Sequence, residues 1–190
     1  RLPPSEEENV NVCIEWYNKG LSMLSEENGV EALNCFERAI GGAPREEREL
    51  RIRAQNGRGH ALYQLARYPE SIQAYHAAIS MDPAGVTGKS LYNMGSSYAA
   101  VELYSDAIKC FEQALGRGLE DEDVAICKTQ INRCKLLHKE QQKRQQELEL
   151  QLKSKHQNSQ KRMQHINALM DHHRKDEDQH NQDAARIQSL

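Results

Sequence analysis

One spacing that occurs three times constrains this 190-residue chain more than any other feature. Gly20, Gly59 and Gly95 are 39 and 36 residues apart. Three aromatic residues follow the same two intervals, and they are Phe36, Tyr75 and Phe111. Self-similarity at a period of 20–50 residues is the signature of a repeat architecture. The sequence therefore predicts a stack of similar units.

Each unit is interpreted as two short helices. In the second helix a small residue at 32, 71 or 107 precedes the aromatic residue by four positions, which places both on one helical face. In the first helix the glycine lets the partner helix approach closely, and the aromatic side chain fills the space between units. Pro44 and Pro83 follow the second helices, where proline ends a helix without breaking it. The expected fold class is an all-α helix-turn-helix solenoid.

The first unit contains Trp16, Gly20, Met23, Ala32, Phe36, Ala39 and Pro44, and this pattern resembles the tetratricopeptide repeat family. In the 34-residue frame of that family, the units are residues 13–46, 52–85 and 88–121, after a leader of residues 1–12. Lys19 and Arg58 depart from the pattern, because the family prefers Leu there. The extra residues 47–51 are expected to lengthen the first helix of the second unit.

The resemblance implies a concave groove lined by the first helix of each unit, where such solenoids bind extended partners. The family's groove positions, transferred to this chain, give an apolar wall in unit one and a polar, partly basic lining in units two and three. We therefore expect the groove to bind an acidic or polar peptide or protein segment with an apolar anchor. The expected groove residues are Tyr17, Leu21, Arg53, Asn56, His60, Tyr63, Lys89, Tyr92 and Ser96.

Some relatives in the family hold acidic C-termini with a dicarboxylate clamp of lysine, asparagine and arginine side chains. This chain carries Tyr17, Leu21, Gly57, Ser90 and Met94 at the five clamp positions. The resemblance therefore does not extend to that clamp. A groove that is only solvated, with the partner bound elsewhere, remains the alternative.

Residues 119–190 contain neither glycine nor proline, which predicts uninterrupted helix. Val124, Cys127, Ile131 and Cys134 follow the 3-4-3 spacing of an amphipathic helix. Because the last repeat of a solenoid needs a cover that is polar outside, residues 122–137 are expected to be a capping helix over unit three.

Residues 138–190 are predicted to form a long, Gln- and charge-rich helix. The heptad that starts at Val124 continues through this segment and collects more apolar residues than random placement would, although Lys155 and Arg162 interrupt it. One interpretation is a solvated helix. The other is a weak coiled coil with a copy of itself or with another member of an assembly, through Leu148, Leu152, Ile166, Leu169, Ile187 and Leu190.

Composition excludes several classes of partner. The net charge of -3 is not concentrated as in a nucleic-acid-binding protein, and no apolar run is long enough to span a membrane. The five cysteines include no CxxC pair, which favours reduced, buried thiols and an intracellular, cytoplasmic location, with a nuclear or ciliary one left open. His172, Asp176 and His180 have i,i+4 spacing but no HExxH motif, so no metal or other cofactor is expected.

These observations favour a non-enzymatic adaptor, with no catalytic residue, that recognises a protein segment and is tethered by its C-terminal helix. His60 has no nucleophile or carboxylate recurring beside it at helical spacing, which argues against catalysis. Two alternatives stay open: a structural scaffold component of filament or ciliary type, or a regulatory module of an enzyme elsewhere in the polypeptide. The first residue, Arg1, keeps the last alternative open.

Overall fold

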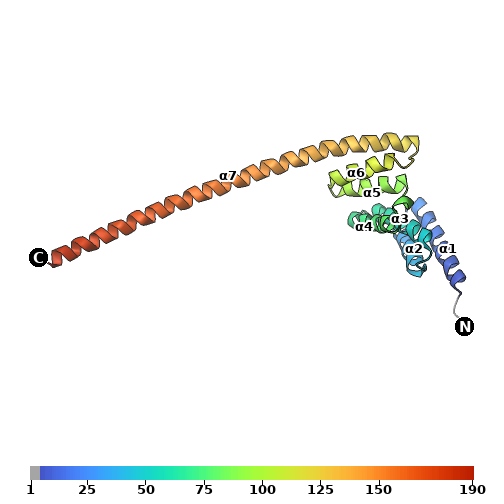
Figure 1. Cartoon of the computed structure of the whole chain (residues 1–190), viewed down its shortest axis with the longest axis horizontal. Helices are drawn as coiled ribbons and strands as arrows, with labels where there is room; N and C mark the ends of the chain where they lie inside the picture. The colour runs from blue at the N-terminus through green and yellow to red at the C-terminus, as the bar shows by residue number, and fades with distance from the viewer. Residues whose placement is uncertain (1–4) are drawn as a thin grey trace. The chain divides into compact units, whose positions relative to one another are not determined.

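The computed structural model describes residues 5–190, and this part of the chain contains helices and no strand (Figure 1). The elements are α1 (Glu6–Ser25), α2 (Gly29–Gly42), α3 (Arg48–Gln64), α4 (Tyr68–Met81), the 3₁₀ turn η1 (Pro83–Gly85), α5 (Gly88–Ala100), α6 (Tyr104–Leu115) and α7 (Asp121–Gln188). Helices α1 and α2, α3 and α4, and α5 and α6 pack as three hairpins, and α2 and α4 also pack against the next hairpin. The predicted all-α solenoid is confirmed.

The chain divides into two compact units at Lys139 and Glu140. We call residues 5–139 the solenoid and residues 140–190 the tail, and α7 contributes to both.

Helix α1 begins at Glu6, inside the segment predicted as a leader, of which residues 1–4 lie outside the described part. The Oγ of Ser5 accepts a hydrogen bond from the Glu8 amide at 3.2 Å, and the Glu8 carboxylate accepts one from the Ser5 amide at 2.9 Å. This capping box satisfies two amides at the helix start, and glutamates in the first turn complement the helix dipole. The helix therefore extends N-terminal to the predicted boundary at residue 13.

Each hairpin turns through one residue with positive φ, and none of the three is glycine. These residues are Glu27, Ala66 and Glu102, with φ of 57°, 56° and 62°. At the second turn the Ala66 amide donates to the Tyr63 carbonyl and the Arg67 amide to the Leu62 carbonyl, both at 2.9 Å. Such bonds close the end of the first helix with a left-handed residue. The three turns are spaced like the glycines, so the repeat is also present in the backbone conformation.

The hairpin cores are built on an aromatic ring that lies against a glycine. A Cβ added to Gly20, Gly59 or Gly95 would come within 2.8 Å of the ring of Phe36, Tyr75 or Phe111, respectively. Gly57 of α3 approaches the same Phe36 ring from the next hairpin, where a Cβ would lie only 2.5 Å away. Phe36 is completely buried between these two glycines. The aromatic side chain therefore joins consecutive units.

Helix α3 has 17 residues, whereas α5 has 13. Arg51 in the added N-terminal turn donates to the Ala43 carbonyl at 2.8 Å and to the Ile40 carbonyl at 3.2 Å. The insertion at residues 47–51 thus lengthens α3 and joins it to the end of α2.

The first turns of α7 cover the last hairpin. Cys127, Ile131 and Cys134 are buried in one apolar cluster with Phe111 and Tyr104. The Cys127 thiol also donates to the Phe111 carbonyl, with an S to O distance of 3.3 Å. This arrangement is the capping helix included in the predicted fold.

All five cysteines lie in the described part of the chain and are buried, free thiols. Burial raises the pKa of each thiol, and raises that of Cys110 to about 12. Because the thiolate is the nucleophilic and metal-binding form, these residues act as small apolar core side chains.

The contact between Gly57 and Phe36 can be tested by adding one methyl group. We expect Gly57→Ala to lower the free energy of unfolding by about 1–3 kcal/mol, because Gly20 prevents the ring from moving away. Gly41→Ala is the matched control in α2, because nothing lies within 4 Å of its added Cβ. The higher helix propensity of alanine should raise the free energy of unfolding of this variant by up to about 1 kcal/mol. Urea unfolding followed by circular dichroism measures both. Equal effects of the two changes would contradict this packing account.

Candidate functional site

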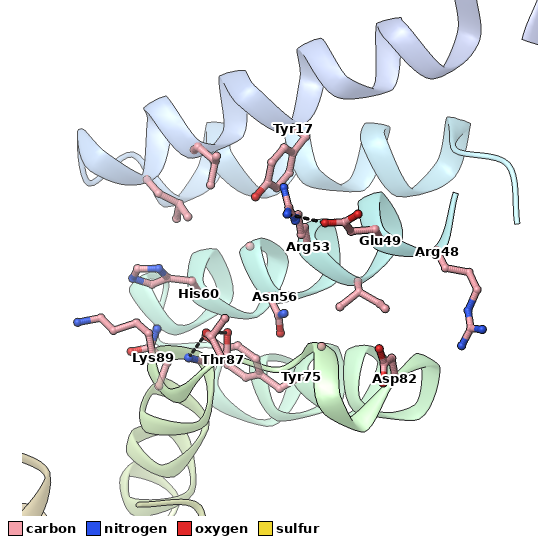
Figure 2. Close-up of a pocket in the computed structure, with 17 residues that line it drawn as sticks. Tyr17, Arg48, Glu49, Arg53, Asn56, His60, Tyr75, Asp82, Thr87 and Lys89 are labelled. Carbon is pink, nitrogen blue, oxygen red and sulfur yellow. Dashed lines mark hydrogen bonds and ion pairs between the residues drawn. The ribbon is translucent and has the colours of Figure 1, made fainter. Parts of the chain in front are cut away.

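An open hollow of about 990 Å³ lies on the solenoid where α1, α3, η1 and the start of α5 meet (Figure 2). The lining from α1 is apolar, whereas α3 and α5 contribute mainly polar and charged side chains. Six of the predicted groove residues line it: Tyr17, Leu21, Arg53, Asn56, His60 and Lys89. We call this hollow the groove.

The other three predicted residues line a separate hollow of about 270 Å³ with residues of the α7 cap. They are Tyr63, Tyr92 and Ser96. The ring of Tyr92 packs against Phe111 with a centroid distance of 5.5 Å, which draws it toward the core of the third hairpin. The predicted lining is therefore divided between two hollows of the solenoid.

The groove also contains charged residues that the sequence analysis did not select. Glu49 lies one turn before Arg53 on α3, and their side chains form an ion pair of 2.5 Å. Continuing the helical stripe back from Arg53 would have found Glu49. Asp82 reaches the groove through the turn after α4, where its carboxylate accepts a hydrogen bond from the Ala84 amide at 3.0 Å. No sequence spacing indicates that position.

The charges of the groove are mixed, with a small positive excess. Arg48, Arg53 and Lys89 contribute three positive charges, and Glu49 and Asp82 two negative ones. Arg48 donates to the Met81 carbonyl, and the Lys89 ammonium lies 3.6 Å from the Asp123 carboxylate. Arg53 is the most available cation, because its ion-pair partner Glu49 is exposed, and exposed pairs are weak.

One buried polar atom at the base of the groove has no hydrogen-bond partner, the Asn56 Oδ1. The Tyr75 side chain lies at the same base; burial raises the pKa of Tyr75, and a hydrogen bond with the Asn93 side chain opposes that rise. Figure 2 shows both side chains at the base of the groove, Asn56 from α3 and Tyr75 from α4. An unsatisfied buried polar group costs about 1–3 kcal/mol, so a ligand that donates to the Asn56 Oδ1 gains binding free energy.

The tail holds the six predicted association residues at exposed positions. Their exposed fractions run from 48% at Ile166 to 104% at Leu190. Along the same helix His172 lies 3.5 Å from Asp176, but no three His, Cys, Asp or Glu side chains within residues 5–190 gather as a metal site requires.

None of the described helices combines the length and apolar character needed to cross a bilayer.

His60 makes the solenoid sensitive to acid. Burial, and secondarily the charge of Lys89, lower the pKa of His60 below its ordinary value of 6.5. The folded state therefore binds fewer protons here than the unfolded chain, so the contribution of His60 to stability is lost as the pH falls through about 6.5. We expect His60→Gln to lose less stability than the wild type between about pH 7.5 and pH 5.5, measured by urea unfolding. Identical losses would refute this role.

Models of the tetratricopeptide repeat match residues 52–84 and 90–125. These ranges contain most of the second and third hairpins and the start of α7. Among solved structures, the chain is similar to the C-terminal TPR-containing domain of a Plasmodium falciparum protein described as an FK506-binding protein, with 16% sequence identity and a TM-score of 0.63. The similarity covers 74% of this chain and 97% of that domain, and it shows the fold.

The comparison with curated proteins found no match. The repeat models match the second and third helical hairpins, and the solved domain has the same fold. Residues 52–84 and 90–125 of this chain are therefore tetratricopeptide repeats.

Proposed function

We propose that this protein is a non-enzymatic adaptor that binds a segment of a partner protein in the groove and is tethered to an assembly by its tail. Tetratricopeptide repeats are protein–protein interaction modules. The observation that carries the proposal is the groove: an open hollow of about 990 Å³ with an apolar wall opposite a polar, weakly basic one. Five free, buried thiols support a cytoplasmic location as part of the proposal.

The two walls favour an extended segment with one apolar and one acidic side chain. Leu21 and Leu24 of α1 offer apolar surface, and Leu21 is 42% exposed. Arg53 and Lys89 stand on the polar side, where they can pair with a carboxylate. A main-chain N–H of the same segment could donate to the Asn56 Oδ1 after a rotation of that amide.

A triple substitution tests the groove. We expect Arg53→Ala, Asn56→Ala and Lys89→Ala together to weaken peptide binding by about tenfold or more, because they remove two of the three groove cations and the central amide. The probes are peptides selected on the full wild-type chain from a random twelve-residue phage library. Isothermal titration calorimetry then measures their dissociation constants.

The matched control removes the same residue types outside the groove lining, at the exposed positions Asn34, Arg45 and Lys109. This control should bind the selected peptides like the wild type. If the groove variant binds every selected peptide as tightly as the control does, the groove is not the binding site.

A structural scaffold role is the second candidate, because nine of the exposed large apolar residues lie in the tail. Here the tail, and not the groove, would be the main contact. Lysine crosslinking of the full chain in cells, read by mass spectrometry, separates the two functions. An adaptor should crosslink to its partner through Lys89 beside the groove, whereas a scaffold component should crosslink mainly through Lys153, Lys155 and Lys161.

A further inference from the structure

The tail carries three apolar groups separated by two blocks of opposite charge. Every residue from 142 to 190 is exposed, so these apolar side chains have no cover within the chain. Residues 153–162, which we call the basic block, contain four Lys or Arg and no acidic residue. Residues 171–183, the acidic block, contain five acidic and two basic residues, a net charge of -3. The apolar groups are Leu148 with Leu152, then Met163 to Met170, then Ile187 with Leu190.

We propose that two copies of this chain associate through their tails as an antiparallel helix pair centred between Asn167 and Ala168. This proposal deepens the tethering role given to the tail above, and it names a second copy as the partner. In this register each residue faces the one at an equal distance on the other side of the centre.

The antiparallel register brings apolar groups together. At the centre, Ile166 of each copy faces Leu169 of the other, and Met163 and Met170 flank these pairs on one side. Toward the ends, Leu148 faces Ile187. These side chains are between 48% and 72% exposed in the single chain, so pairing would remove apolar surface from water at the centre and at both ends.

The charge blocks decide between the two orientations. The six predicted association residues lie on one stripe of the helix. In a parallel, in-register pair, each of these stripe residues would face the same residue of the second chain. That pair would also place Lys155 against Lys155 and Arg162 against Arg162 along the line of contact. The antiparallel pair places each basic block beside an acidic block. Asp176 then lies opposite Ser159, between Arg162 and Lys155 of the other copy. Its cost is that Leu152 faces Asp183 and Leu190 faces Gln145, so two of the six stripe residues in each chain lack an apolar partner.

Charge exchange tests the register in the full chain. By sedimentation equilibrium, Arg162→Glu and Asp176→Lys should each raise the dimer dissociation constant by about tenfold, because each sets like charges against each other. The double variant should restore the wild-type constant, since it exchanges the two signs. Asp178→Lys is the matched control: residue 178 lies two positions from Asp176, on the opposite face of the helix, so it should change the constant by less than about twofold.

Orientation is tested by mixed disulfides. Leu148→Cys chains mixed with Ile187→Cys chains should form a mixed disulfide dimer on mild oxidation, and Leu148→Cys alone should not, because its two copies lie about 60 Å apart in this register at 1.5 Å per residue. The native cysteines do not compete, since all five are buried in the solenoid. A chain that stays monomeric, a failure of the double variant to recover, or a Leu148→Cys homodimer would overturn the proposal. None of these results depends on peptide binding in the groove.

Discussion

The solenoid depends on one contact that occurs three times, an aromatic ring of the second helix lying on a glycine of the first. Because a Cβ at Gly20, Gly59 or Gly95 would meet the ring within 2.8 Å, the two helices of each hairpin can be this close only without a side chain there. Phe36 extends the contact to Gly57 and so sets how α3 lies against the first hairpin. The groove depends on this packing, because most of its lining comes from α1 and α3.

The fold was predictable where a constant spacing carried the information. The glycine and aromatic positions recur at 39 and 36 residues, and the structure brings each pair into contact. Gly57 was missed as a packing residue because the equivalent positions hold Asn18 and Asn93, so no repeat marks it. The start of α1 lies outside the 34-residue repeat frame, which begins at residue 13: the capping box of Ser5 and Glu8 marks the start of this helix in the sequence, but it is not part of the repeat.

The lining of the groove was predictable only in part, because it includes residues of turns as well as residues on the exposed stripes of helices. The stripe of α3 gives Arg53, Asn56 and His60, and all three line the groove. Asp82 enters through the turn after α4, whose path depends on how two hairpins pack and not on a local pattern. Tyr92 fits the stripe of α5, but its packing against Phe111 takes it to the second hollow. Residues that helical periodicity places on one stripe can therefore line different hollows, because tertiary contacts decide where each side chain lies.

The two parts of the chain differ in what holds them in shape. The solenoid buries Phe36, Tyr75 and Phe111 almost completely, so its fold is stabilised within the chain. The tail has no such core, and its side chains make local contacts such as the 3.0 Å pair of Arg174 with Asp171. Pairs of this kind contribute only about 0.2–0.5 kcal/mol each. A helix with so little internal stabilisation gains most from covering Leu148, Ile166 and Leu169, which is the physical basis of the proposed pairing of two tails.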